Sequence, residues 1–254
     1  MKISTVIICY NSENTIRKTL NSLDWSDEII VVDSFSTDST PDICKEFDVT
    51  FFQKEWQGFG KQRRWGVEQT NNDWIFVIDS DEEISDELKS ELLNIKNEGA
   101  KADVYAMSWK VYYMNRWIRH SGWYPNYKER LFNKRSASWN ESNLHEKLIY
   151  EGVAVKLKGD LYHYTYKDID DQLEKINRYT TIAAEGLYAK GIKASFIKSV
   201  FGSIWRFKKV YFLKLGFLDG LAGFTIAVME SYYVMLRYFK HAEIIIADKK
   251  ESNR

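Results

Sequence analysis

The chain has 254 residues, which is long enough for one large domain or for one domain with an appendage. Its 36 basic and 36 acidic residues balance, so no global charge favours a nucleic-acid partner. An apolar share of 44% and only two prolines argue against a disordered chain.

Residues 1–100 alternate strand patterns with helix patterns. Short runs rich in Val, Ile and Phe predict buried strands at residues 5–9, 29–32, 49–52 and 74–79. Polar residues ahead of apolar residues at helical spacing predict helices that start near Ser12, at Thr40, at Lys61 and after Ser85. This alternation indicates βαβ units, and therefore an α/β fold with a mostly parallel, Rossmann-like sheet.

The pattern changes after Asp103. Strand patterns at residues 104–114, 128–133, 153–157 and 161–164 predict a mixed, partly antiparallel extension of the sheet. From Asp168 onward the apolar residues follow helical spacing. We therefore expect two domains, an α/β domain of residues 1–166 and a helical C-terminal region of residues 167–254.

Two carboxylates, Asp79 and Asp81, follow the apolar run 74–78 with Ser80 between them. They would lie on a loop at the carboxyl edge of the sheet, where open α/β sheets bind their ligands. Carboxylates at this spacing suit a hard divalent cation, which prefers oxygen ligands and often bridges to phosphate. The motif therefore predicts a site for a metal and a phosphorylated substrate.

Three other polar segments map to the same edge. Tyr10 and Asn11 end the first strand, residues 33–40 follow the second, and residues 60–66 lie on the helix before the fourth. Each alone also fits a role as a turn or as a solvated helix face. Their coincidence at strand ends favours a binding site.

Taken together, these segments resemble the family 2 glycosyltransferases, which have the GT-A fold. The resemblance covers about residues 1–165, and residues 6–11, 32–38, 63–66 and 78–82 carry it. It implies a UDP-sugar donor, with Tyr10 and Asp33 on the uracil and Arg63 on the nucleotide. Arg64 stands where the family usually has Asn. The donor contacts that the resemblance implies are Tyr10, Asn11, Asp33, Ser36, Arg63, Asp79 and Ser80.

The same resemblance implies that Asp81 binds Mg²⁺ or Mn²⁺ on the diphosphate, with His163 as a further metal ligand. Imidazole binds Mn²⁺ well, although a lone histidine on a strand is also often a packed, hydrogen-bonded residue. A divalent cation stabilises the negative charge that develops on a departing diphosphate.

A base for the acceptor hydroxyl is expected near residues 143–147. This segment resembles a subgroup that transfers glucose to inner-core heptose of lipopolysaccharide, the β-1,4-glucosyltransferases. The resemblance makes Glu146 the candidate base, with His145 assisting, and one carboxylate suffices for an inverting displacement. The alternative is a surface loop with a charge pair.

The C-terminal segment 196–239 is dense in apolar and aromatic residues that alternate with Lys and Arg. Such helices are typical of a membrane interface. Its most apolar part, residues 221–236, is short for a span and contains Glu230. We expect peripheral binding to the inner face of the cell membrane. The alternative is a helix pair that packs on the first domain or forms a dimer.

The start of the chain lacks a signal-peptide pattern, and Cys9 and Cys44 lack metal-ligand spacing. The catalytic part is therefore expected in the cytoplasm, with both thiols free. The predicted function is an inverting, metal-dependent hexosyltransferase that moves a hexose, glucose first of all, from a UDP-sugar to a glycolipid such as lipopolysaccharide inner core.

Two alternative functions compete with this prediction. A sugar-nucleotide pyrophosphorylase would need a glycine-rich loop after the first strand, and residues 10–13 contain no glycine. A catalytically silent sugar- or nucleotide-binding scaffold at the membrane would keep the aromatic residues and the C-terminal region without turnover.

Overall fold

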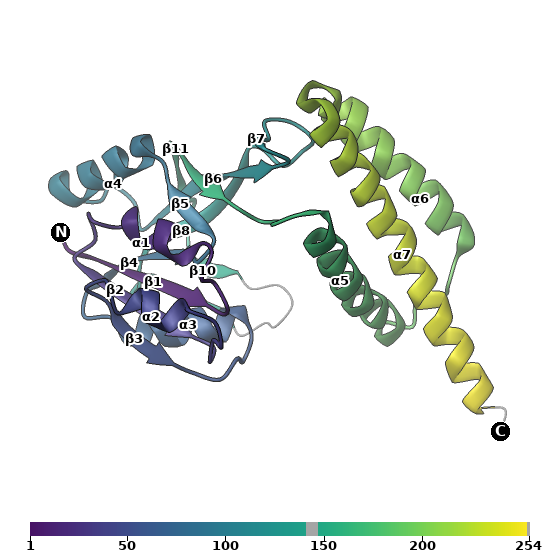
Figure 1. Cartoon of the computed structure of the whole chain (residues 1–254), viewed down its shortest axis with the longest axis horizontal. Coiled ribbons are helices and arrows are strands. Elements are labelled where there is room, and N and C mark those ends of the chain that lie inside the picture. Colours follow the sequence, from purple (N-terminus) through teal and green to yellow (C-terminus); the bar gives the residue numbers. More distant parts are fainter. Residues whose placement is uncertain (141–146, 253–254) are drawn as a thin grey trace. The chain divides into compact units, whose positions relative to one another are not determined.

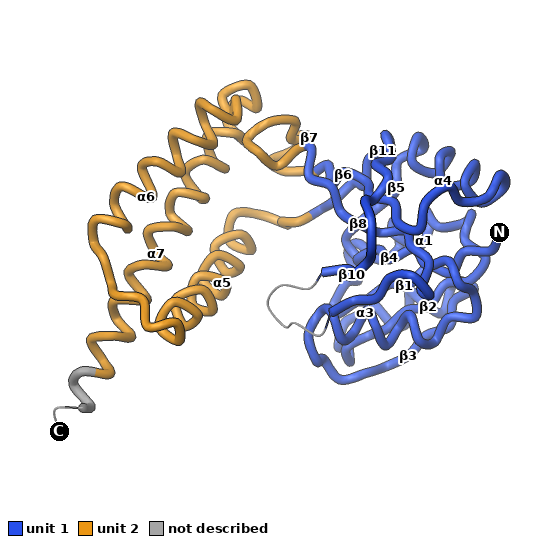
Figure 2. Tube along the Cα trace, turned by 180° about the vertical axis from the view of Figure 1, so that it is seen from behind, with its two compact units in different colours: residues 1–110, 125–164 blue, residues 111–124, 165–254 orange. Residues whose placement is uncertain are grey.

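The computed structural model describes residues 1–140 and 147–252. The chain forms two compact units, each described here by itself (Figure 2). Unit 1 comprises Met1–Lys110 and Pro125–Tyr164, and unit 2 comprises Val111–Tyr124 and the chain from Thr165 onward. The chain thus crosses between the units close to the expected boundary at residue 166, but the insertion 111–124 belongs to unit 2. The division into domains of residues 1–166 and 167–254 stays a prediction.

Unit 1 is built on a mixed sheet in the order β3-β2-β1-β4-β8-β6-β11-β5 (Figure 1). Strands β1 to β4 are mutually parallel where they pair, whereas β8 runs antiparallel to β4 and β6, and β5 antiparallel to β11. This arrangement confirms the α/β fold class with its antiparallel extension. The strands are β1 (Ile3–Cys9), β2 (Glu28–Asp33), β3 (Thr50–Gln53), β4 (Trp74–Asp79), β5 (Glu82–Ile84), β6 (Val104–Tyr113), β8 (Asn126–Asn133) and β11 (Val155–His163).

Four helices and a small hairpin complete unit 1. The helices are α1 (Ile16–Asn21), α2 (Thr40–Cys44), α3 (Phe59–Glu68) and α4 (Asp86–Glu98), and the hairpin strands are β9 (Ala137–Trp139) and β10 (Leu148–Tyr150). The predicted start of α4 is confirmed, because the Ser85 hydroxyl accepts from the Leu88 N–H at 3.2 Å.

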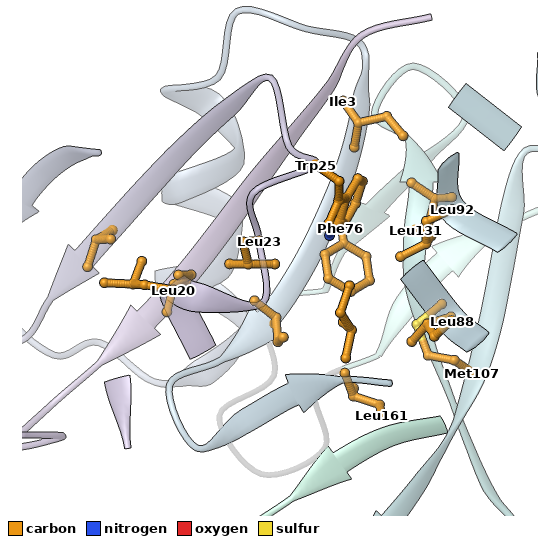
Figure 3. Close-up of a cluster of buried hydrophobic side chains, with 14 of the residues drawn as sticks. Ile3, Leu20, Leu23, Trp25, Phe76, Leu88, Leu92, Met107, Leu131 and Leu161 are labelled. Atoms are coloured by element: carbon orange, nitrogen blue, oxygen red, sulfur yellow. The ribbon is translucent and has the colours of Figure 1, made fainter. Parts of the chain in front are cut away.

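Apolar side chains cover both faces of the central strands. Ile3 and Phe76 belong to one core (Figure 3), whereas Val6 and Val77 belong to a core on the other face. Every residue of β1 is buried, and apart from Ser4 and Thr5 its residues are apolar, without the alternation of a half-exposed strand.

Gly159 explains why one strand was predicted as two. The sequence patterns at 153–157 and 161–164 are parts of the single strand β11. A Cβ at Gly159 would lie 2.2 Å from the Leu88 nitrogen, so the glycine permits a close approach of α4 to the strand. A glycine inside a strand marks such an approach as well as a break. Strands β5, β9 and β10 were not predicted, since each has only three residues.

Unit 2 is helical apart from the strand β7 (Arg116–Trp117), which pairs with the end of β6. Its elements are α5 (Ile169–Ala189), α6 (Phe196–Lys208), the π-helical turn η1 (Lys209–Leu213), the 3₁₀ turn η2 (Gly216–Asp219) and α7 (Gly220–Ser252). Helices α6 and α7 form a hairpin with η1 and η2 at its turn (Figure 1). The predicted start of α5 is confirmed, because Asp168 Oδ1 accepts from the Asp171 N–H at 2.8 Å.

Asp219 joins the insertion 111–124 to the turn of this hairpin. Its side chain is buried and accepts from the His120 N–H at 2.9 Å, the Ser121 hydroxyl at 3.1 Å and the Arg119 N–H at 3.2 Å. These bonds, made by residues about 100 positions apart, explain why the insertion belongs to unit 2.

Within the described part of the chain, no single helix is both long enough and apolar enough to cross a membrane. One pair of helical segments, Phe196–Leu213 and Gly216–Asp248, meets those criteria jointly, by length and composition alone, with a bend of 70°.

Gly159→Ala is expected to lower the free energy of unfolding by at least about 2 kcal/mol, because the methyl group would overlap the Leu88 backbone. Gly186→Ala is the matched control. Gly186 lies within α5 with no atom near its would-be Cβ, so alanine should raise stability by up to about 1 kcal/mol. Urea unfolding of both variants measures the difference. Equal effects of the two substitutions would contradict the close packing at Gly159.

Candidate functional site

The carboxyl ends of β2, β1 and β4 lie next to one another because these strands are parallel neighbours. Hydrogen bonds join the loops that follow them. The Asn11 N–H donates to Ser36 Oγ at 2.8 Å, and Ser12 Oγ lies 2.8 Å from Ser80 Oγ. Ser80 is buried, and its carbonyl accepts from the Thr19 hydroxyl at 3.0 Å. The polar segments that the sequence assigned to one edge therefore meet there.

Asp33 is fully buried at the end of β2. Its carboxylate accepts from the Ser36 N–H at 2.9 Å, from Gln53 Nε2 at 3.2 Å and from the Ser36 hydroxyl. The side chain thus shapes the loop that Ser36 belongs to. Contact between Asp33 and a base stays a prediction.

Two aromatic side chains are exposed at this edge. Tyr10 is 58% exposed and Phe35 is 50% exposed. Phe35 has a φ of 60°, which is unusual for a bulky residue and is a form of strain found at binding sites. Sequence patterns gave no signal for Phe35, because a positive φ at a residue other than glycine cannot be read from them. Both rings are candidates for stacking on a planar ligand.

Buried ion pairs hold the loop after β4. The Asp79 carboxylate accepts from Arg63 at 2.7 and 2.9 Å and from Arg130 at 2.8 Å. Arg130 also donates to Glu82 Oε1 at 2.7 Å, while Glu82 Oε2 accepts from the Asp79 N–H at 2.9 Å. We call Arg63, Asp79, Glu82 and Arg130 the Asp79 network. The ion pair between Glu82 and Arg130 was not predicted from the sequence. In the sequence, these two residues are recognisable only as charged residues within or beside a strand pattern.

Burial and charge act in opposite directions on the two acids of this network. Burial raises the pKa of Asp79, but the adjacent Arg130 and Arg63 outweigh it and hold that pKa well below its usual range. Burial raises the pKa of Glu82 to about 7, with Arg130 opposing and the Asp79 charge reinforcing the shift. Arg63 itself is buried behind Asp79, so its contact with a nucleotide stays a prediction.

Asp81 lies between Asp79 and Glu82 in the chain, and its side chain lies beside His163. The Asp81 Oδ2 atom lies 3.4 Å from His163 Nε2, and the carboxylate keeps 36% of its surface exposed. The pairing of β5 with β11 brings the histidine to this place, opposite Glu82 in the register. Trp109 covers the imidazole, with ring centroids 4.4 Å apart.

The electrostatic surroundings favour a positive group next to Asp81. Burial disfavours the charged form of His163, but the hydrogen bond to Asp81 and the nearby Glu82 and Asp79 carboxylates raise its pKa. The same negative potential favours a cation.

A divalent cation fits this pair of side chains. No group of three or more His, Cys, Asp or Glu residues suited to a metal occurs in the described ranges. Asp81 and His163 supply one oxygen and one nitrogen donor, a set that suits Mn²⁺. Cations that act on phosphates usually take their remaining ligands from the phosphate oxygens and water.

A cavity of about 530 Å³ in unit 1 lies elsewhere. It is lined by Asp73 and Arg135 among others, and Asp73 directly precedes β4, so the cavity opens at the amino edge of the sheet. The polar cluster at the carboxyl edge is the stronger candidate site, because three loops converge there.

The candidate base Glu146 and its neighbour His145 lie outside the described residues. They belong to the connection between β9 and β10, whose ends are joined by a bond from the Asn140 N–H to the Lys147 carbonyl at 3.0 Å. Their catalytic roles stay predictions.

Comparison with known proteins gives a consistent result. The family model described as glycosyl transferase family 2 matches residues 4–148. An uncharacterized glycosyltransferase of Rickettsia typhi is 31% identical over 98% of this chain and 89% of its own length. The lipopolysaccharide core biosynthesis glycosyltransferase LpsC of Rhizobium meliloti is 29% identical over 95% of this chain and 94% of its own. Among solved structures, S. aureus TarS 1-349 in complex with UDP-GlcNAc matches with a TM-score of 0.44 and 16% identity, covering 98% of this chain and 92% of that chain.

Arg130→Met is expected to lower the free energy of unfolding by about 3–5 kcal/mol, because it removes a buried partner that both Asp79 and Glu82 share. Adding Glu82→Gln should recover part of this loss. Arg135→Met is the control, since Arg135 pairs with Asp73 on the surface and should cost less than about 1 kcal/mol. The measurement is denaturant unfolding of the single and double variants. Strict additivity of Arg130→Met and Glu82→Gln would contradict the coupling.

Proposed function

This chain belongs to glycosyl transferase family 2, and on that premise we propose that it moves a hexose from a UDP-sugar to a hydroxyl group of a glycolipid, with inversion at the sugar carbon. Glucose is the hexose we propose first. The observation that carries the proposal is the half-exposed Asp81 beside His163, next to a loop that buried charges hold in place.

The residues at the carboxyl edge of the sheet are suited to assist the departure of the diphosphate. Asp81 and His163 would hold Mg²⁺ or Mn²⁺, and the cation would supply charge stabilisation to the departing diphosphate. The Asp79 network keeps the loop rigid, so that the Asp81 carboxylate needs little reorganisation on binding. Trp109 restricts the orientation of the His163 ring.

The residues proposed to contact the donor fall into an exposed group and a buried group. Tyr10 and Phe35 are exposed, and we propose that Tyr10 stacks on the uracil. Asp33, Ser80 and Arg63 are buried, so we propose that they act mainly by shaping the loops around the donor. Asn11 and Ser36 link two of these loops.

The proposed acceptor is a lipid-linked oligosaccharide, and its hydroxyl group needs a base. Similarity to LpsC along nearly the whole chain supports a lipid-linked core oligosaccharide as the acceptor. We propose Glu146 as the base that takes the proton from the acceptor hydroxyl, with His145 assisting it. A lipid-linked acceptor would place the enzyme at the inner face of the cell membrane.

Asp81→Asn is expected to lower kcat/KM by about 100-fold or more, because the charge that holds the cation is lost. The assay follows release of UDP from UDP-glucose with a glycolipid acceptor, with and without EDTA. Asp24→Asn is the matched control, since Asp24 is an exposed carboxylate at the amino edge of the sheet, paired with Lys89. Turnover that needs no metal and that Asp81→Asn leaves unchanged would rule out the proposed site.

Tyr10→Ala is expected to weaken binding of UDP by about 10-fold through loss of stacking. Tyr10→Phe keeps the ring and should bind UDP nearly as well as the native chain. Titration calorimetry with UDP and Mn²⁺ measures both. Equal weakening by Ala and Phe would assign the contact to the hydroxyl instead of the ring.

A further inference from the structure

Exposed apolar side chains concentrate on the hairpin of unit 2. Thirteen large apolar residues between 196 and 228 are exposed in the structure. Phe196, Phe201 and Leu221 are 73%, 67% and 70% exposed, far more than a packed helix would leave open. We call these exposed side chains of residues 196–228 the apolar hairpin face. Exposed apolar surface of this extent marks an interaction site.

On α6 the exposed residues form one stripe. Ile197, Phe201, Ile204 and Trp205 follow one another at spacings of four, three and one, which places them on the same side of a helix. These four apolar residues of α6 therefore point away from the rest of unit 2, whereas Phe207 on the same helix packs against the core of the unit.

The packed side of α6 carries small residues. Ser199, Gly202 and Ser203 face α7, where a Cβ at Gly202 would lie 3.3 Å from Val234 and the Ser203 carbonyl accepts from the Ser231 hydroxyl at 2.8 Å. Helices that pack through small residues and serine hydrogen bonds, with large apolar residues outside, are typical of proteins in contact with lipid. A water-soluble helix pair shows the reverse arrangement.

The turn of the hairpin presents apolar side chains at its tip. A Cβ at Gly223 would lie 1.8 Å from the Gly216 carbonyl oxygen, so only glycine permits this close turn. Around it Phe212, Leu213 and Leu218 are 55%, 63% and 51% exposed.

Positive charge accompanies the apolar hairpin face, although the whole chain is neutral. Between residues 190 and 221 there are six Lys and one Arg, and the single acid, Asp219, is buried. Arg206 is neutralised by Glu230 at 2.8 Å. The lysines nearest the tip are at positions 208, 209 and 214. Anionic lipid attracts such a basic fringe, whereas a second copy of the same face would place lysines against lysines.

We propose that the apolar hairpin face binds an anionic phospholipid bilayer, with the tip around Leu213 at the level of the acyl chains and the lysines at the headgroups. The helices would lie in the interface without spanning it. The inference deepens the proposed function, on which its link to a lipid-linked acceptor rests. Binding of the bilayer by this face does not depend on which reaction the chain catalyses.

The test is co-sedimentation of the full chain with vesicles of phosphatidylcholine containing about one third phosphatidylglycerol. The native chain is expected to sediment with these vesicles, and less so at high salt or with phosphatidylcholine alone. Leu213→Glu should weaken the partition at least about 10-fold, because a charge would enter the apolar region. Ile149→Glu is the matched control, since Ile149 is 56% exposed in unit 1 and should change binding less than about 2-fold.

Replacing Lys208, Lys209 and Lys214 by Glu leaves the apolar residues unchanged. This variant should bind anionic vesicles about 10-fold more weakly than the native chain. The proposal is overturned if the native chain does not sediment with the vesicles, or if Leu213→Glu and Ile149→Glu change vesicle binding equally. It is equally overturned if sedimentation equilibrium shows a dimer that Leu213→Glu dissociates. Vesicle binding without any transfer of sugar would contradict the proposed function and leave this inference standing.

Discussion

The loop that follows β4 depends on the mutual neutralisation of four buried charges. Two arginines and two carboxylates of the Asp79 network are taken out of water, which costs several kcal/mol per ion before their attraction compensates. Such an arrangement contributes little net stability but permits few alternative conformations. Its result is that Asp81, which takes no part in the network, stands half-exposed at a fixed place beside His163.

Some residues at the carboxyl edge of the sheet shape the site, and others remain available to a ligand. Asp33, Ser80 and Arg63 use their polar atoms on other protein groups, namely Ser36, Ser12 and Asp79. Tyr10 and Asp81 keep exposed surface. A family motif thus contains both kinds of residue, and only the structure distinguishes them. The rigid shell reduces the reorganisation that a charged transition state would otherwise require.

Sequence patterns predicted the features that depend on local chemistry. The buried runs of β1, β2 and β4, the convergence of the loops that follow them, the cap Ser85 and the start of the helical region at Asp168 follow from composition and spacing. Features that depend on distant contacts escaped them. From the sequence, Gly159 indicates a break between two strands, whereas in the structure it permits the close approach of α4. Arg130 is part of a strand pattern in the sequence, and only the structure shows its bonds to Asp79 and Glu82. The insertion 111–124 joins unit 2 through Asp219, about 100 residues away in the chain.

The central claim is that Asp81 and His163 together hold a divalent cation beside the Asp79 network. Crystals soaked with Mn²⁺ and UDP test it most directly, through the anomalous scattering of manganese. The account predicts one strong peak within bonding distance of both Asp81 and His163, with diphosphate oxygens completing the coordination. A manganese peak bound elsewhere, with neither side chain among its ligands, would contradict it.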